Sequence, residues 1–280
     1  MYTTIISVKE LDNIIENNNL IIFDCRYNLV EKGLGYSQYL KSHINNSHYI
    51  DLESDLSSNV LEFSGRHPLQ DIKKFSNIIN KYGVNTNSQI VVYDEDNSSM
   101  CSRLWWMLRL IGIKNCAVLD GGYKAWKLNN MPTNNVVPNN YKEEKMQYNY
   151  NSNYLIDTKT LKNKLEKKSI CLVDARDPDR FSGKVEPIDK KAGHVPGAIN
   201  LPFKGNLDED NFFKSKGELK KRFKKALKDN SKDVVNMCGS GVTACHNFLA
   251  MEYCGIGITK IYVGSWSAWS SHKDNKIEKA

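Results

Sequence analysis

The chain contains 280 residues, 40% of them hydrophobic and 25% charged, a composition typical of globular proteins and unlike that of disordered or fibrous chains. A chain of this length can form two domains, each with its own core. The net charge of +7 comes from lysines spread through both halves, so we expect no nucleic-acid partner. The densest basic run, 220–228, is typical of a solvated helix face.

The amino-terminal sequence has no basic segment followed by a long apolar run, and no later stretch approaches about 18 consecutive apolar residues. We therefore expect a cytoplasmic protein with no membrane partner. The seven cysteines include no CxxC pair and no cluster with histidine at zinc-ligand spacing. Their odd number and spacing predict reduced thiols, with neither a disulfide framework nor a metal site.

The predicted elements follow the same order in each half of the chain. A polar helix start precedes an apolar strand, at 20–24 in the first half and at 170–174 in the second. A long loop, a helix, a second apolar strand, another loop, a third helix and a closing strand follow in both halves. Because strands alternate with helices, we predict an α/β fold in which each half is a mostly parallel sheet flanked by helices.

Matching positions in the two halves indicate an internal repeat. Asp24 corresponds to Asp174 at an offset of 150 positions, and Trp126 corresponds to Trp269 at an offset of 143. Between the halves, 129–153 is rich in asparagine and contains two prolines, which is typical of a linker. We predict a non-catalytic domain at 1–135, a linker at 136–153 and a catalytic domain at 154–280.

The segment after the apolar strand at 233–237 carries the strongest chemical signal. It reads CGSGVTA from Cys238 and leads into a helix that begins near Thr243. Gly239 and Gly241 allow a tight turn whose N–H groups point inward, and the helix adds its positive end. This cradle should stabilise an anion and should favour the thiolate of Cys238, the form that acts as a nucleophile.

Core packing is the alternative role for each cysteine. A cysteine before Gly-x-Gly at the end of a strand fills a core poorly, so we interpret Cys238 as reactive. Cys245 and Cys254 lie within and at the end of an apolar helix, and we interpret both as core residues.

The corresponding loop of the first half has Asp94 where the second half has Cys238. Acidic side chains at 94–96 would repel an anion from the cradle, so we predict that the first domain is non-catalytic. Cys101 is the one alternative nucleophile in that loop.

Several motifs carry a resemblance to a known family. CGSGVTA, together with LVDAR at 172–176, GHVPGAINLPF at 193–203 and GSWSAW at 264–269, resembles the tandem-domain rhodanese-like sulfurtransferases. The loop is most similar to that of 3-mercaptopyruvate sulfurtransferases, and GRHPL at 65–69 extends the resemblance into the first half. The resemblance implies an enzyme without a cofactor, in which Cys238 carries sulfur as a persulfide.

The resemblance also implies a small anionic sulfur donor, 3-mercaptopyruvate, and an acceptor such as thioredoxin, a low-molecular-weight thiol or cyanide. Neutral Gly239 and Ser240 follow the nucleophile, whereas rhodaneses that favour the thiosulfate dianion carry basic residues there. Thiosulfate:cyanide sulfur transfer by the same mechanism is the first alternative, and a sulfur-binding module without turnover is a more distant one. A cysteine phosphatase would need arginine where this chain has Ala244.

Arg180 stands where the family places the arginine that binds the substrate carboxylate, which a planar guanidinium can hold through two hydrogen bonds. A salt bridge with Asp177 or Asp179 is the alternative role for Arg180. The family's second arginine is missing, because Ile188 stands in its place. Its charge could come from one of two nearby lysines, Lys190 or Lys191.

Ser240 can hydrogen-bond a substrate oxygen, and the resemblance implies a relay from this serine to His67 and, by alignment, to Glu53. Asp51 and Asp55 are alternative acids, and a structural role at a helix entry is the alternative for His67. The expected substrate-binding backbone groups are those of Gly239, Gly241, Val242 and Thr243.

Overall fold

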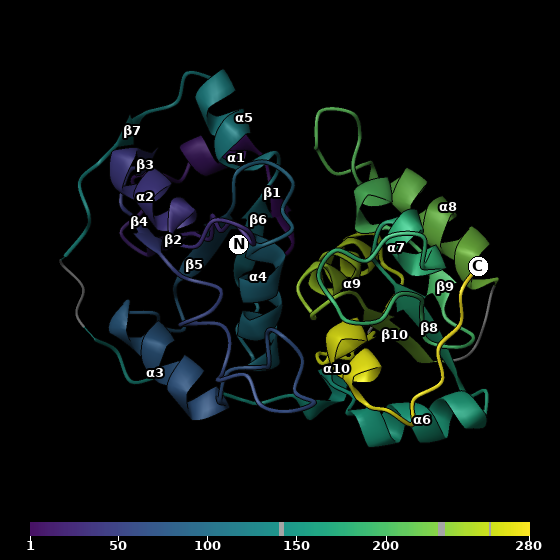
Figure 1. Ribbon diagram of the computed structural model, residues 1–280. Coiled ribbons are helices and arrows are strands. Elements are labelled where there is room, and N and C mark those ends of the chain that lie inside the picture. Colours follow the sequence, from purple (N-terminus) through teal and green to yellow (C-terminus); the bar gives the residue numbers. More distant parts are fainter. Residues whose placement is uncertain (140–142, 229–232, 258) are drawn as a thin grey trace. The chain divides into compact units, whose positions relative to one another are not determined.

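The computed structural model describes residues 1–139, 143–228, 233–257 and 259–280, which form two compact units (Figure 1). Unit 1 comprises Met1–Ser58, Gln70–Asn151 and Glu209–Phe212. Unit 2 comprises Asn59–Leu69, Ser152–Asp208 and Phe213–Ala280. Unit 2 therefore includes a segment, 59–69, that chain order alone would assign to the first half, and the predicted domain limits do not anticipate it.

Unit 1 is built around a five-stranded parallel sheet with the strand order β1-β6-β5-β2-β4. A short antiparallel pair, β3 with β7, lies outside this sheet. The elements of unit 1 are β1 (Ile5–Ile6), α1 (Val8–Asp12), β2 (Leu20–Asp24), α2 (Leu34–Lys41), β3 (His43–Ile44), β4 (Ser47–Tyr49), α3 (Ile72–Lys81), β5 (Gln89–Tyr93), α4 (Cys101–Leu110), β6 (Cys116–Leu119), α5 (Gly122–Leu128) and β7 (Thr133–Asn134).

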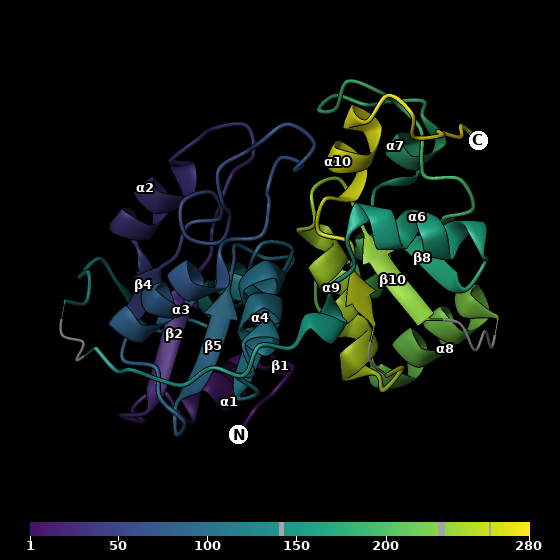
Figure 2. The same cartoon turned by 90° about the horizontal axis from the view of Figure 1, so that it is seen from below.

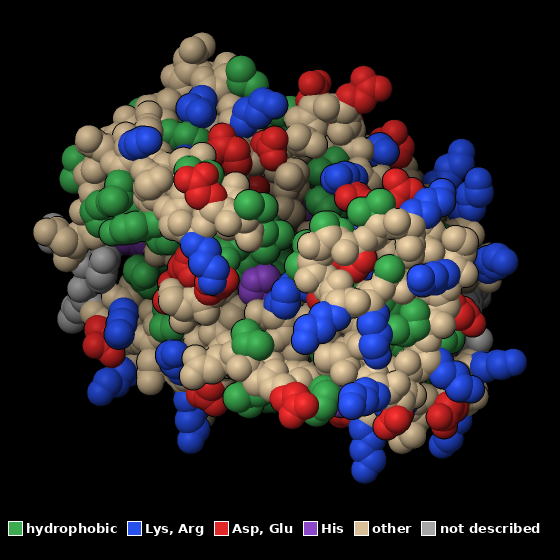
Figure 3. Space-filling model, in the orientation of Figure 1, with side chains coloured by type: hydrophobic (Ala, Val, Ile, Leu, Met, Phe, Trp, Pro, Cys, Tyr) green, Lys and Arg blue, Asp and Glu red, His purple; other side chains and the backbone are tan. Residues whose placement is uncertain are grey.

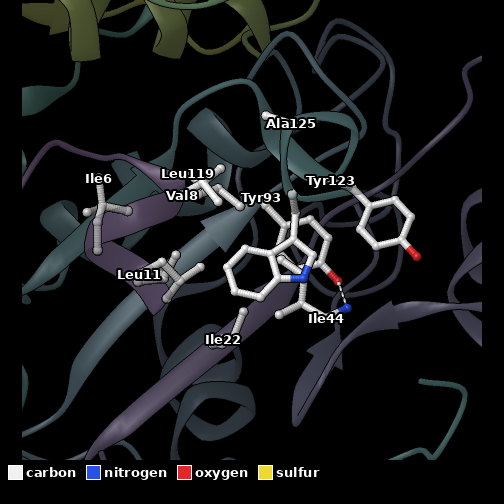
Figure 4. Close-up of a cluster of buried hydrophobic side chains, with 12 residues drawn as sticks. Ile6, Val8, Leu11, Ile22, Ile44, Tyr93, Leu119, Tyr123 and Ala125 are labelled. Atoms are coloured by element: carbon white, nitrogen blue, oxygen red, sulfur yellow. Dashed lines mark hydrogen bonds between the residues drawn. The ribbon is translucent and has the colours of Figure 1, made fainter. Parts of the chain in front are cut away.

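One hydrophobic cluster of unit 1 forms where helices α1 and α5 pack on the sheet (Figure 4). Every residue of β5 is buried, as expected for the central strand of a parallel sheet covered on both faces. Tyr93 is the last residue of β5, and its side chain is buried. Its hydroxyl accepts a hydrogen bond from the backbone N–H of Ile44 at 3.2 Å. This bond ties β3 to the carboxyl edge of the sheet.

Unit 2 repeats the architecture with a four-stranded parallel sheet in the order β11-β10-β8-β9. In Figures 1 and 2, α6 and α10 lie on one side of this sheet and α8 and α9 lie on the other. The elements of unit 2 are η1 (Ser152–Tyr154), α6 (Thr158–Glu166), β8 (Ile170–Asp174), α7 (Pro178–Ser182), β9 (Ile199–Asn200), η2 (Phe203–Asn206), α8 (Lys216–Leu227), β10 (Asp233–Met237), α9 (Thr243–Tyr253), β11 (Lys260–Ile261) and α10 (Ser265–Ser271).

A buried aspartate–arginine pair recurs at the same place in both units. Asp24 ends β2 and binds Arg26 at 2.6 Å, and Asp174 ends β8 and binds Arg176 at 2.8 Å. Each pair fixes the loop that leaves the strand, because the aspartate also accepts the backbone N–H of its arginine. The predicted fold class and the predicted strands at 20–24 and 170–174 are confirmed.

The basic run in the second half lies on α8, as predicted. Leu219, Phe223 and Leu227 are buried along one face of this helix, while its lysines are exposed. Figure 3 shows acidic side chains among the basic ones on the visible surface. Among the described residues, no helix is both long enough and apolar enough to cross a membrane.

Candidate active site

Cys238 lies at the carboxyl end of β10, at the start of a short loop into α9. The strand β10 pairs with β8 on one side and with β11 on the other, so this loop emerges near the middle of the sheet. Carboxyl ends of parallel strands are where ligand sites form in such sheets. Cys238 is 2% exposed, which places its thiol in a sheltered position beneath the surface.

The carbonyl groups at the start of this loop are bound by α10. The backbone N–H groups of Trp266 and Ser267 donate to the carbonyls of Cys238 and Gly239, each at 2.9 Å. The hydroxyl of Ser265 accepts the backbone N–H of Cys238 at 3.1 Å. The start of α10 therefore fixes the backbone of the nucleophile loop.

The remaining N–H groups of the loop are those that the sequence predicts to bind an anion. The N–H of Gly241 donates to the Cys238 sulfur at 3.1 Å. Within the described ranges, four further N–H groups of the loop donate to no protein acceptor: those of Gly239, Ser240, Val242 and Thr243. Unsatisfied N–H groups at a helix start favour a bound anion, so the loop can hold negative charge next to the thiol.

Gly241 cannot be replaced without moving the loop. Its φ is +78°, and an added Cβ would lie 2.5 Å from the carbonyl oxygen of Val263. This close approach requires glycine, because a backbone atom cannot move aside as a flexible side chain can.

His67 lies against Ser240, within unit 2. The Nδ1 of His67 is 2.8 Å from the Ser240 hydroxyl oxygen, and both side chains are buried. The segment 59–69 is held there by Gly65, whose added Cβ would lie 2.8 Å from the carbonyl oxygen of Gly264, and by Phe63, which stacks on His272 at 4.3 Å. The structure therefore brings together three of the expected catalytic side chains: Cys238, Ser240 and His67.

Glu53 lies in unit 1, unlike the other expected catalytic residues. Its carboxylate pairs with Lys32 at 3.0 Å, and the Glu53 side chain is 42% exposed. Asp51 accepts the backbone N–H groups of Glu53 and Ser54, as in a turn. The role of Glu53 as the relay acid stays a prediction.

Arg180 belongs to α7 and faces the nucleophile loop. An added Cβ on Gly239 would lie 3.4 Å from the Nη1 of Arg180. Its Nη2 donates to Glu186 at 2.7 Å and to Asp189 at 3.4 Å, so its acidic partners are not Asp177 or Asp179. Burial alone would raise the pKa of Glu186, but the hydrogen bond from Arg180 and two backbone N–H groups lower it.

Arg66 is a further candidate that the sequence analysis missed. Its Nη1 pairs with Asp189, and its Nη2 would lie 3.1 Å from a Cβ on Gly239. The available signal was its position directly before His67 in the GRHPL motif. Ile188, by contrast, is exposed, and Lys191 donates to the carbonyl of His272 at 3.4 Å.

In the corresponding loop of unit 1, the N–H groups are bound by a side chain of the loop itself. The Asp94 carboxylate accepts the N–H groups of Ser98 at 2.9 Å, Met100 at 2.8 Å and Cys101 at 3.3 Å. Burial raises the pKa of Asp94 to about 6, against the lowering effect of these bonds. Burial also raises the pKa of the Cys101 thiol well above its usual value, which disfavours a thiolate there.

A metal site is not formed by the described residues, among which no group of three or more His, Cys, Asp or Glu side chains could hold an ion. At Cys238 the structure places a thiol beside backbone N–H groups, a hydroxyl–imidazole pair and two guanidiniums.

Comparisons with known proteins identify the family. The model of the rhodanese-like domain matches residues 7–129 and again residues 157–272. A Pseudomonas aeruginosa protein named "Probable 3-mercaptopyruvate sulfurtransferase" is 36% identical over 268 residues, covering 95% of this chain and 94% of its own. The thiosulfate sulfurtransferase of Bos taurus is 31% identical over 237 residues, covering 83% and 78%.

A solved structure supports the same assignment. The 3-mercaptopyruvate sulfurtransferase from Leishmania major superposes with a TM-score of 0.85 at 28% identity, over 96% of this chain and 74% of its own. The chain therefore belongs to the rhodanese-like family of sulfurtransferases.

Proposed function

We propose that this enzyme transfers sulfur from 3-mercaptopyruvate to a thiol acceptor, with Cys238 as the carrier of a persulfide. The observation that supports this proposal most directly is the set of unsatisfied N–H groups in the loop that begins at Cys238, where the N–H of Gly241 already donates to the sulfur. A terminal persulfide anion would find hydrogen-bond donors there that no protein acceptor uses.

In the first half-reaction, the thiolate of Cys238 attacks the thiol sulfur of mercaptopyruvate. The carbon–sulfur bond of the donor breaks, and its electron pair leaves with the enolate of pyruvate. The Ser240 hydroxyl, next to His67 at 2.8 Å, can donate a hydrogen bond to the developing enolate oxygen. The enolate carbon then takes up the proton that the transferred sulfur carried, which leaves pyruvate and an anionic persulfide.

In the second half-reaction, an acceptor thiolate attacks the terminal sulfur of the persulfide. The sulfur–sulfur bond breaks, the Cys238 thiolate is regenerated, and the acceptor leaves as its own persulfide. Thioredoxin or a low-molecular-weight thiol fits this step, and cyanide would leave as thiocyanate. The sequence of steps is ping-pong covalent catalysis that needs no cofactor. The cytoplasmic location inferred from the sequence stays a prediction.

The alternative donor is thiosulfate, which one of the relatives described above acts on according to its name. Gly239 and Ser240 add no positive charge directly after the nucleophile, which favours a donor with one carboxylate over a compact dianion. We expect a higher kcat/KM for mercaptopyruvate when both donors are assayed with the same acceptor. Faster turnover of thiosulfate at equal concentrations below saturation would make thiosulfate the donor.

A module that binds sulfur without turnover is the other candidate. Alkylation of Cys238 distinguishes an enzyme from a binding module. An enzyme should transfer many sulfur atoms per chain to a thiol, and alkylation should abolish this steady-state transfer. A protein that accepts one sulfur per chain and never releases it to a thiol would instead be a binding module.

A further inference from the structure

Two guanidinium groups converge on the nucleophile loop at Gly239. One belongs to Arg180 in α7 and the other to Arg66 in the segment 59–69, and both segments are parts of unit 2. A Cβ added to Gly239 would lie 3.1 Å from Arg66 Nη2 and 3.4 Å from Arg180 Nη1. The absence of a side chain at Gly239 therefore leaves room that both guanidiniums reach, one residue from Cys238.

Each guanidinium uses only some of its N–H groups in bonds to the described residues. Arg66 uses Nη1 for Asp189, and Arg180 uses Nη2 for Glu186 and Asp189. Within the part of the chain that the structure describes, the Nη2 of Arg66 and the Nη1 of Arg180 bind no protein acceptor. The Nε of Arg180 is buried without a hydrogen-bond partner among the same residues. A buried donor without an acceptor is costly, and a bound anion would remove that cost.

Asp189 joins the two arginines. One of its carboxylate oxygens pairs with Arg66 and the other with Arg180, and the Asp189 side chain is 6% exposed. The backbone N–H of Asp189 donates to the Glu186 carboxylate at 3.1 Å, so the backbone of Asp189 is bound to the same acid as Arg180. Both guanidiniums are thus held by one carboxylate on one side, while their remaining N–H groups face the loop.

We propose that Arg66 is the second donor-binding arginine of this site, and that Arg66 and Arg180 together hold the donor's carboxylate. This inference rests on the proposed function, because it assigns the carboxylate of the sulfur donor to these two residues. Asp189 is a positioning residue that sets the separation of the two guanidiniums. Two planar donors on one carboxylate give geometric specificity that a flexible lysine, such as Lys190 or Lys191, does not.

The test compares two donors that differ only in the carboxylate: mercaptopyruvate and 1-mercaptopropan-2-one, which keeps the thiol and the ketone. For Arg66→Ala we expect KM for mercaptopyruvate to rise at least tenfold, with a smaller change in kcat. Kinetics with mercaptopropanone should stay within about twofold of those of the unaltered enzyme. Lys204→Ala is the matched control, because it removes one positive charge from an exposed pair with Asp177 elsewhere in unit 2.

Two further variants keep the test decisive if Arg66→Ala folds poorly. Arg66→Lys keeps the charge and should recover only part of the loss, since an ammonium cannot reproduce the fork. In the double variant Arg66→Ala with Arg180→Ala, the loss should be smaller than the product of the single losses, because both residues bind one carboxylate.

Equal losses with both donors, or an unchanged KM for mercaptopyruvate, would show that Arg66 does not bind the carboxylate. The proposed function is tested separately, on the unaltered enzyme. If the unaltered enzyme does not turn over mercaptopyruvate, the proposed function itself is wrong, whatever the variants show.

Discussion

The Nδ1 of His67 lies 2.8 Å from the hydroxyl of Ser240, although 173 positions separate the two residues. The contact exists because the segment 59–69 belongs to unit 2, where Gly65 fits against the carbonyl of Gly264. When Nδ1 carries the imidazole proton, His67 donates to the Ser240 oxygen, and the hydroxyl hydrogen of Ser240 is left for an oxygen of the sulfur donor. The segment 59–69 therefore supplies the imidazole that lies next to the Ser240 hydroxyl.

We expect Ser240→Ala and His67→Ala each to lower kcat for mercaptopyruvate by ten- to a hundredfold, roughly the contribution of one general acid–base group or less. The KM should change less, because neither side chain is assigned to the donor's carboxylate. The double variant should be little worse than either single variant, since the two residues act as one unit. Losses that multiply in the double variant would show that the residues act independently.

Cys238→Ser should abolish sulfur transfer, whereas Cys101→Ser should retain most of it. Of these two cysteines in the described chain, Cys238 begins a loop with unsatisfied N–H groups, whereas Asp94 accepts the N–H groups of Met100 and Cys101. After treatment with the donor alone, mass spectrometry should find one added sulfur, about 32 Da, on the Cys238 peptide. The same mass on the Cys101 peptide would place the nucleophile in unit 1.

Two glycines of the loop should respond differently to alanine. At Gly239 the added Cβ meets the ends of two flexible arginines, so Gly239→Ala should fold but should raise KM for mercaptopyruvate. At Gly241 the Cβ meets the Val263 carbonyl at 2.5 Å and φ is +78°, so Gly241→Ala should lose activity and thermal stability together. A thermal midpoint for Gly241→Ala equal to that of Gly239→Ala would contradict this reading of the loop.

Much of the fold was accessible from the sequence because it rests on local patterns. An apolar strand that ends in Asp-x-Arg, as at 170–176, is visible in one window, and the structure shows its cause in the buried Asp174–Arg176 pair. The tight turn after Cys238 was also predictable, since Gly241 adopts the positive φ that glycine accommodates most easily.

The rest of the site depends on packing between distant segments, which no local pattern encodes. Chain order groups 59–69 with the first half, but the stacking of Phe63 on His272 and the fit of Gly65 place it in unit 2. Arg66 was missed for this reason, because nothing within its own segment shows that Asp189 and Gly239 lie beside it.

Asp94 should give unit 1 a measurable pH dependence. Burial raises its pKa from 3.8 to about 6, so between these values the folded protein keeps a proton that the unfolded chain has released. Unfolding then releases a proton, and a rise in pH through this window therefore lowers the free energy of unfolding. The shift corresponds to about 3 kcal/mol in total, at roughly 1.4 kcal/mol for each unit of pKa.

Asp94→Asn removes this titration and keeps a side chain of the same shape. The amide oxygen of asparagine can still accept one of the loop N–H groups. Its amide nitrogen replaces the second carboxylate oxygen and cannot accept, so the variant should lose stability by the same amount at every pH. Urea unfolding of both proteins at pH 4, 5, 6 and 7 isolates the pH-dependent part, because all other titrating groups are shared. The difference in unfolding free energy should shift by up to about 3 kcal/mol in favour of the asparagine variant as the pH rises. A difference that stays constant across this range would mean that the Asp94 carboxylate is already ionised at pH 4, with the loop N–H groups outweighing its burial.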